Sequence, residues 1–366
     1  MTIEVFHYDI LYVGVALIIT ELYWLIDRKE TKNIRILDIL MICVLVFFSA
    51  FRYNVGSDYQ SYLERYRYII QNWNIVQGRI HSEKLFYQLC YLTSCLTKSR
   101  FGVFFMCAVV QYPILVAVAR KNCLHPSRVI FCYVFLEFYA ISNNILRQSL
   151  ALEFVMLGVL AWINKKRIVS LFLFLVAFGF HTTAILGIIL FLASLRLKPN
   201  ITTYLVCMFA SIVFFFGWKY IIQIIAFIPY VNKYTGYFVK NGNHVARAAM
   251  YLYFGFYNFL SILFIKNSRR IQEYNKNHYK FISCILLSLP LFAVATHMVY
   301  ANRIGMYLYQ FSIFLVADLF EIINRNVNKI KLEQVFLKST LIIWLLLVNV
   351  LSINNSFWQY SFIWSQ

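Results

Sequence analysis

The chain has 366 residues, of which 61% are hydrophobic, 19% aromatic and only 13% charged, whereas a soluble domain carries about 25% charged residues. This composition excludes an ordinary soluble domain. The formal net charge of +19 does not indicate nucleic-acid binding in a chain this apolar, because the cytoplasmic loops of membrane proteins are basic and face anionic lipid.

Apolar runs of roughly 17–25 residues, long enough to cross a bilayer as helices, recur along the whole chain. They predict an all-α polytopic membrane protein with about 12 transmembrane helices (about 10–13) in a single integral membrane domain, 1–366. The N-terminal stretch MTIEVFHYDI has no basic n-region, so the first helix is expected to be an uncleaved insertion signal. The predicted spans are 8–26, 36–52, 101–119, 129–141, 146–163, 168–180, 182–195, 201–217, 249–265, 279–299, 303–321 and 336–354.

Basic connectors predict the direction of these helices, because short cytoplasmic loops are rich in lysine and arginine. Placing the basic connectors inside puts both termini on the outer side. These connectors are 27–35, 120–128, 165–167, 196–198, 266–280 and 325–338.

Two large connectors are then expected outside, at approximately 53–100 and 218–248. Within the first, the segment 85–97 (LFYQLCYLTSCLT) is too short to span comfortably, and both flanking spans must meet the outer side. It is therefore predicted to be a re-entrant or interfacial helix. The first half of 218–248 is apolar and is expected to lie in the interface, with Trp and Tyr anchors.

Ionisable and polar residues near the outer face are informative, because charge in a membrane is costly and is retained mainly for function. Each has a structural alternative: Arg52 and Arg303 could snorkel to the interface, and Asp58 could cap the following helix. His181 could be a packed histidine bonded to a carbonyl. Arg147 favours function, because the macrodipole disfavours a cation where a helix begins. The candidates are Arg52, Asp58, Tyr59, Arg147, Gln148, His181 and Arg303.

Two carboxylates and four tyrosines carry weaker signals. Glu137 and Glu153 lie in apolar helices, where each could act as a base or neutralise a buried arginine. The outer-loop tyrosines could stack on sugars, although most aromatic residues in this chain are expected to pack against lipid or the core. These tyrosines are Tyr53, Tyr59, Tyr62 and Tyr66.

Standard nucleotide, metal and serine-hydrolase motifs do not occur in the sequence, and neither does a DxD pair that could carry a divalent cation to a diphosphate. A metal-free site can still stabilise a leaving pyrophosphate with arginines, whose guanidinium fork matches phosphate oxygens. Cys90 and Cys95 are the two cysteines expected to reach an oxidising side, and their spacing favours packing over a disulfide.

Four short motifs at these positions carry a family resemblance. They are FRYNVGSDYQSY (51–62), NNILRQSLALE (143–153), FGFHTTAILGI (178–188) and NRIGMYLY (302–309). In order and spacing they resemble the Arg–Gly–x–Asp–Tyr, Arg-Gln, Phe-x-His and late-arginine motifs of the EpsG-like branch of bacterial Wzy polysaccharide polymerases, over most of the chain.

The resemblance implies a GT-C-like integral membrane glycosyltransferase of the bacterial inner membrane, active on the periplasmic face. Its substrate would be an oligosaccharide on undecaprenyl pyrophosphate, with membrane lipid and a chain-length regulator as further partners. It would need no nucleotide sugar. From the missing motifs and the composition described above, we expect no metal, no other cofactor and no nucleic-acid partner. The residues carried over are Asp58 and His181 as catalytic groups, Arg52, Arg147 and Arg303 for pyrophosphate, and Tyr59 and Gln148 for substrate. Tyr62, one of the outer-loop tyrosines, is added as a further substrate contact.

Other functions remain open at this point. A flippase for lipid-linked oligosaccharides would also be basic, but its charges would line a central cavity open to both sides, whereas the candidates here gather near one predicted face. An O-antigen ligase would use similar substrates. A membrane acyltransferase usually relies on an embedded histidine, and His181 keeps that alternative open.

Overall fold

The computed structural model describes residues 34–79, 82–227, 244–298, 300–324, 337, 339–340, 343–344 and 361–362. The chain forms two compact units, which are described separately. Unit 1 comprises Met1–Ala184 and Asn355–Gln366, and unit 2 comprises Ile185–Asn354. The first predicted span, 8–26, lies outside the described residues, as does most of the last, 336–354.

Unit 1 is built on long apolar helices that follow the predicted spans closely. These helices are α2 (Ile34–Ala50), α6 (Gly102–Asn122), α9 (Leu146–Ile163) and α10 (Arg167–Phe180). Apolar side chains make up most of each helix, and α6 ends with basic Arg120 and Lys121 in its last turn.

Helices α9 and α10 form an antiparallel hairpin. A short turn joins them at Asn164–Lys166, where Lys165 adopts a left-handed conformation, with φ of 63°. Close approach is possible because a Cβ at Gly158 would lie 2.5 Å from the Phe174 ring. The Ser170 hydroxyl also donates to the Gly158 carbonyl oxygen at 2.7 Å. The first turn of α9 and the last turn of α10 therefore lie at the same end of the unit.

The single span predicted at 129–141 is instead two short helices, α7 (Pro126–Phe135) and α8 (Phe138–Asn144). The break lies at Glu137, whose φ of 69° is left-handed and ends helical continuity. Every residue of α7 is buried. Irregular backbone at membrane depth is tolerated where protein covers it, so this segment forms the interior of unit 1.

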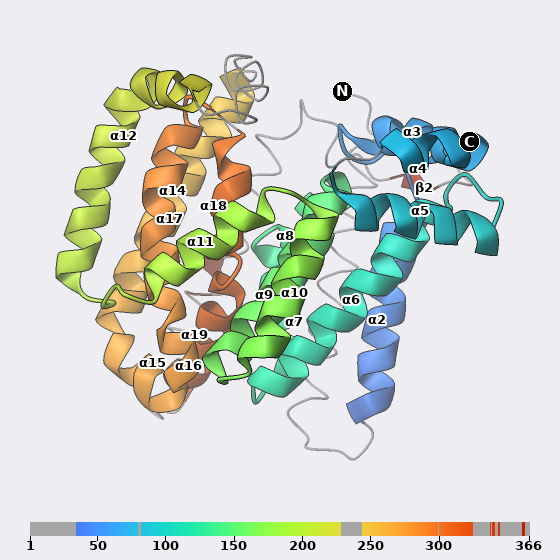
Figure 1. Ribbon diagram of the computed structural model, residues 1–366. Coiled ribbons are helices and arrows are strands. Elements are labelled where there is room, and N and C mark those ends of the chain that lie inside the picture. Colours follow the sequence, from blue (N-terminus) through green and yellow to red (C-terminus); the bar gives the residue numbers. More distant parts are fainter. Residues whose placement is uncertain are drawn as a thin grey trace, which may run out of the picture. The chain divides into compact units, whose positions relative to one another are not determined.

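In its described residues, the connector between α2 and α6 contains three helices. They are α3 (Tyr59–Gln71), α4 (Trp73–Arg79) and α5 (Lys84–Leu96). Helix α5 packs against α3, α6 and α10, and in Figure 1 the three helices lie together at one end of unit 1. With 13 residues, α5 is shorter than a spanning helix, as predicted for 85–97. A two-residue strand pair, β1 (Arg52–Tyr53) with β2 (Ser361–Phe362), lies beside them.

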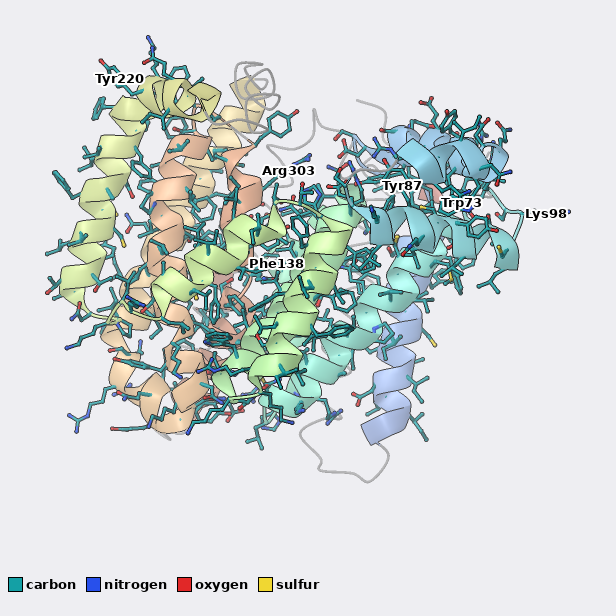
Figure 2. The ribbon with its side chains drawn as sticks, viewed as in Figure 1. Trp73, Tyr87, Lys98, Phe138, Tyr220 and Arg303 are labelled. Carbon is teal, nitrogen blue, oxygen red and sulfur yellow. The ribbon has the colours of Figure 1, made fainter. Side chains whose placement is uncertain are left out.

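The outer location of the whole connector is testable at Lys98. This residue is exposed in the turn after α5, at the edge of unit 1 (Figure 2). In a variant without other reactive cysteines, Lys98→Cys should react with a membrane-impermeant maleimide added to intact spheroplasts. Exposed Cys43 and Cys95 must first be replaced. Labelling of Lys98→Cys from the cytoplasmic side alone would contradict the topology.

Unit 2 contains the second set of apolar helices and a core rich in aromatic side chains. Phe281, Phe292, Tyr309 and Phe311 are almost completely buried, and the Phe292 and Tyr309 rings lie 4.8 Å apart. Its helices are α11 (Ala184–Ser194), α12 (Ile201–Phe227), α14 (His244–Lys266), α15 (Ser268–Tyr274), α16 (Lys276–Tyr279), α17 (Phe281–Ala295), α18 (Ala301–Tyr309) and α19 (Ser312–Asn324).

Helix α12 is longer than the predicted span 201–217, because it continues to Phe227 and includes the first part of the predicted connector 218–248. In Figure 1 the helix bends near its end, so that its last turns point in a different direction from its first part. Only 11% of its most apolar window is buried, so this helix presents its apolar side chains outward. Residues 228–243 lie outside the described residues.

Six helices in the described residues are long and apolar enough to cross a membrane, and four shorter apolar helices accompany them. The prediction of a helical membrane protein is therefore confirmed. The count of about 12 spans stays a prediction, as does the GT-C-like class. All eight cysteines are free in the structure; Cys90 is packed in the interior, whereas Cys95 is exposed.

Candidate functional site

Two of the predicted residues meet at one end of the α9–α10 hairpin. Arg147 is the second residue of α9, which begins after Ile145 leaves helical geometry. His181 directly follows α10 in extended conformation, with φ −153° and ψ 125°. Because the helices are antiparallel neighbours, the start of α9 and the end of α10 bring both side chains to the same place.

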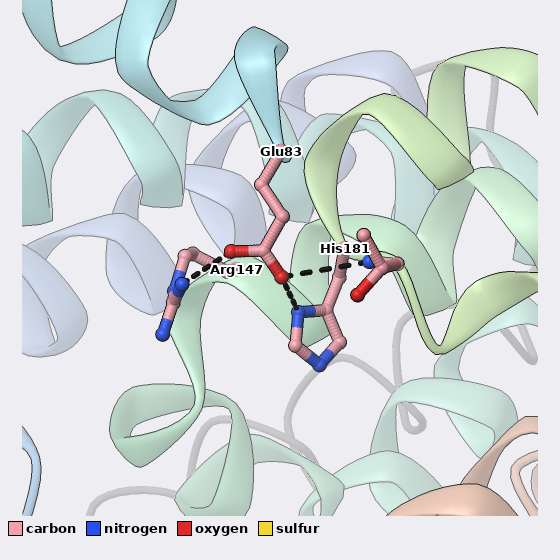
Figure 3. Close-up of polar contacts among 4 residues, drawn as sticks. Glu83, Arg147 and His181 are labelled. Carbon is pink, nitrogen blue, oxygen red and sulfur yellow. Dashed lines mark hydrogen bonds and ion pairs between the residues drawn. The ribbon is translucent and has the colours of Figure 1, made fainter. Parts of the chain in front are cut away.

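Glu83 joins these two residues, as Figure 3 shows. It occupies the N-cap position of α5 with a left-handed backbone, φ 58°. Arg147 Nη1 donates to Glu83 Oε2, His181 Nδ1 lies 2.5 Å from Glu83 Oε1, and the Thr182 amide approaches Oε1 at 3.5 Å. A non-glycine residue held at positive φ is strained, and such strain clusters at functional sites. Thus the connector helix α5 supplies the carboxylate that holds the cation and the imidazole together.

Burial makes these contacts stronger than exposed ion pairs. The side chains of Glu83, His181 and Arg147 are 8%, 16% and 25% exposed. Burial alone raises the pKa of Glu83, but the hydrogen bond to His181 and the charge of Arg147 outweigh it, and the pKa lies below its ordinary value of 4.5. Glu83 is therefore ionised at neutral pH.

The pairing also defines which histidine nitrogen is available. Since ionised Glu83 only accepts, His181 Nδ1 must carry the hydrogen that it donates. The neutral ring then has its lone pair on Nε2, which points away from Glu83 in Figure 3. A carboxylate that fixes the tautomer in this way prepares the opposite nitrogen to accept a proton.

Aromatic residues surround the Arg147 guanidinium. Its Cζ lies 5.9 Å from the ring centroids of both Tyr62 and Phe86, and the Tyr62 hydroxyl hydrogen-bonds to it. Burial raises the pKa of Tyr62, which keeps its hydroxyl neutral. Within the described residues the buried Nε of Arg147 has no hydrogen-bond partner, while 25% of the side chain is exposed.

Arg52 lies in the same unit but is fully buried. Its guanidinium donates to the carbonyl oxygens of Ser49 and Asn143, the latter at 2.8 Å, and lies over the Phe104 ring at 4.6 Å. A phosphate could reach this side chain only if the surrounding residues moved. Its role in pyrophosphate binding stays a prediction.

Asp58 is half-buried at the N-cap position of α3, but its side chain makes no capping hydrogen bond. The structural alternative, in which the Asp58 side chain caps helix α3, is therefore wrong. Its backbone precedes Tyr62 by one turn, with the Tyr62 amide donating to the Asp58 carbonyl at 3.0 Å. The Tyr62 ring lies 5.9 Å from Arg147 Cζ, so Asp58 is one helical turn from a residue that lies beside the Glu83–Arg147–His181 cluster.

The other candidates for substrate binding are covered by protein. Tyr59 is 1% exposed and its ring stacks on Phe104 at 4.5 Å, while Gln148 is 2% exposed. Stacking of sugars on Tyr59 or Tyr62 stays a prediction that requires the rings to become accessible. Arg303 belongs to unit 2, on α18, with its guanidinium 5.1 Å from the Tyr300 ring. Its convergence with Arg147 likewise stays a prediction.

The two intramembrane carboxylates are interior residues. Glu137 is 2% exposed at the break between α7 and α8. Glu153 is 3% exposed. Among the described residues no group of three or more histidine, cysteine or acidic side chains is placed to hold a metal ion.

The model of the EpsG family matches residues 35–362, which is nearly the whole chain and includes all four motifs and the cluster. The chain belongs to the EpsG family. This membership confirms the family resemblance and indicates a membrane enzyme of polysaccharide biosynthesis with a glycosyltransferase-like activity. No curated protein and no solved structure matches the chain.

Glu83 is the residue of this EpsG-family site that the sequence motifs did not reveal. It lies in the link HSEK between two amphipathic helices, outside every motif quoted above. Its only local signal is its place directly before the short helix 84–96, in a connector that also contains Asp58 and Glu64. Its partners lie far along the chain, so only the packing of α5 against α10 identifies it.

The lowered pKa of Glu83 predicts how stability depends on pH. Ionised Glu83 stabilises the fold above its unfolded-state pKa, near 4.5, and this contribution is lost as the pH falls through the lower folded-state pKa. Glu83→Gln should therefore lower the melting temperature more at about pH 7 than at about pH 3. Thermal unfolding in detergent at both pH values tests this. An equal loss at both would show that the charge of Glu83 does not matter.

Proposed function

We propose that the protein is a polymerase of polysaccharide repeat units, of the O-antigen, capsule or exopolysaccharide type. The growing glycan is transferred from undecaprenyl pyrophosphate to the non-reducing-end hydroxyl of a new lipid-linked repeat unit. A bond forms between the acceptor oxygen and the anomeric carbon, and the bond from that carbon to the phosphate oxygen breaks. Undecaprenyl pyrophosphate leaves, and the acceptor proton passes to a base.

The observation that carries this proposal is the Glu83–Arg147–His181 cluster at one end of unit 1. Glycosyl transfer to a hydroxyl needs a proton acceptor beside a cation that meets the charge of the leaving group. The cluster supplies both within one set of contacts. EpsG-family membership supports a glycosyltransferase-like reaction.

His181 is the base in this mechanism, because its Nε2 is the open acceptor of a ring oriented by Glu83. Arg147 meets the pyrophosphate: Glu83 holds one side of its guanidinium, and its remaining N–H groups can donate to phosphate oxygens. Arg52 and Arg303 are further proposed pyrophosphate ligands. Arg52 would bind after the residues that bury it have moved, and Arg303 after its segment has approached the substrate. The charge of these arginines can stabilise the leaving group without a metal.

Asp58 is the second candidate for the base, and we assign it contact with the acceptor sugar. Tyr59, Tyr62 and Gln148 lie beside it or beside Arg147 and are proposed to contact the glycan. The active site faces the periplasmic side of the inner membrane in this proposal. Lipid-linked oligosaccharide reaches it there, and a chain-length regulator is a proposed partner.

A deletion strain tests this function. Loss of a polymerase should leave surface glycan with a single repeat, because export and ligation continue. Loss of a flippase should leave no repeat unit outside. Wild-type protein should restore long chains in this strain, whereas His181→Ala should not. If the deletion strain carries no single-repeat glycan on its surface, the protein is not a polymerase.

A further inference from the structure

The loop that carries Asp58 is fastened to the segment before Arg147 by one asparagine side chain. Asn144 Oδ1 accepts a hydrogen bond from the Asp58 amide at 2.9 Å and one from the Ser57 hydroxyl at 3.3 Å. Asn144 itself is 2% exposed, whereas Ser57 is exposed and Asp58 is half-buried, so both bonds are part-buried. A buried acceptor that receives two hydrogen bonds from one loop fixes where that loop lies.

Gly56 allows this close approach. Its φ of +95° is a conformation that side-chain-bearing residues rarely adopt, and a Cβ there would lie 2.7 Å from Asn144 Oδ1. Both the loop conformation and its distance from Asn144 therefore depend on glycine. The backbone of the NVGSDY stretch therefore packs directly against the Asn144 side chain.

Asn144 is supported from beneath, because α8 is fixed to α2 and α6 by buried hydrogen bonds. Tyr139 donates to the Leu45 carbonyl at 2.8 Å, and the Ser142 hydroxyl lies 3.2 Å from the Tyr112 hydroxyl. Ser49 donates to Asn143 Oδ1 at 2.6 Å. A side chain on such a rigid base is pre-organised, which functional groups require for accurate placement.

We infer that Asn144 is a positioning residue, which places Asp58 relative to Arg147 by clamping the 56–58 loop to the α8–α9 junction. Ile145 alone separates Asn144 from the start of α9, and Arg147 is the second residue of that helix. The clamp therefore links the Asp58 loop to the helix that carries the cation. This inference rests on the proposed function, in which Asp58 contacts the acceptor sugar.

A double-mutant cycle on the purified full-length protein, with native lipid-linked repeat units as substrate, tests the clamp. Asn144→Ala should slow chain extension by up to about 10²-fold, the scale expected when a reacting group is misplaced by about 1 Å. If Asn144 acts through Asp58, the double variant with Asp58→Asn should be no slower than Asp58→Asn alone. If the two substitutions lower the rate of chain extension by factors that multiply in the double variant, the inference is wrong. A normal rate for Asn144→Ala would also overturn it.

Asn143→Ala is the matched control. It removes the same atoms from the neighbouring residue of α8, which is 4% exposed and whose side-chain oxygen bonds Ser49 rather than the loop. Whatever effect it has should multiply with that of Asp58→Asn. If Asn144→Ala does not fold, Gly56→Ala in folded protein replaces it and should show the same lack of additivity.

Hydrogen exchange separates the clamp from the proposed function. The Asp58 amide donates to Asn144, so Asn144→Ala should speed its exchange, whereas Asn143→Ala should not. Unchanged exchange would refute the clamp. Faster exchange in a protein whose wild type forms no polymer would leave the clamp intact and refute the polymerase proposal.

Discussion

Replacing His181 with alanine is expected to lower the rate of chain extension by about 10²- to 10⁴-fold, the usual contribution of a positioned general base. His181 Nδ1 is held by Glu83 at 2.5 Å, which leaves Nε2 to take the acceptor proton. Removing the ring removes that acceptor while Glu83 keeps its contact with Arg147. The measurement is the initial rate of glycan elongation by purified protein, with binding of the lipid-linked unit measured separately.

His125→Ala is the matched control for this experiment. It deletes the same ring from the N-cap position of α7. This position follows the C-terminal end of α6, whereas the connector helices lie at the other end of α6. This variant should extend chains at the wild-type rate. Glu83→Gln should lower the rate and change its pH profile, since the amide no longer fixes the histidine tautomer by its charge. Normal elongation by His181→Ala would eliminate this histidine as the base.

The contrast between the predicted and observed site has a physical origin. Arg147 and His181 were identifiable because each breaks an apolar run at a helix end, where charge is unexpected. Their meeting was also implied, since adjacent spans joined by the short turn at Asn164–Lys166 form an antiparallel hairpin. Local sequence was enough for both residues and for their common end.

Glu83 could not be found in this way, because its importance depends on where α5 packs. Amphipathic connector helices have no preferred depth or direction until their apolar faces find partners, and those partners come from α3, α6 and α10. The left-handed backbone of Glu83 has no sequence signature either. A carboxylate in a short polar link therefore looked like an ordinary surface residue.

The interior of unit 1 shows a second limit. Segment 129–141 is apolar enough to predict one span. In the structure the left-handed backbone of Glu137 interrupts the helix, and most residues on both sides of the break are buried. Hydropathy measures the preference for an apolar environment and does not distinguish lipid from protein interior.

Replacing Arg147 with alanine should have the largest effect of any arginine substitution in unit 1. Its loss is expected to remove about 2.7–4 kcal/mol of transition-state stabilisation, the scale of an oxyanion-hole donor. The guanidinium is held by Glu83 and Tyr62 and is partly exposed, so it is placed to meet phosphate without rearrangement. Arg147→Lys keeps the charge but not the planar fork, and should recover only part of the rate.

Arg120→Ala is the control for loss of a paired arginine. Arg120 donates to Asp38 through Nε at 2.9 Å and Nη2 at 2.5 Å, with 31% of its side chain exposed. It closes the far end of α6, outside the proposed site. Its replacement should cost stability at most, because partly exposed ion pairs contribute little, and elongation by the folded protein should continue.

The same assay in EDTA tests whether fixed cations are sufficient. Wild-type protein should keep its elongation rate when divalent metal is removed, because the arginines meet the pyrophosphate charge. Arg147→Ala should stay slow whether or not Mg²⁺ is added back. A wild-type protein that loses all activity in EDTA would show that a metal carries the leaving-group charge. Full activity in Arg147→Ala would show that this arginine does not carry it.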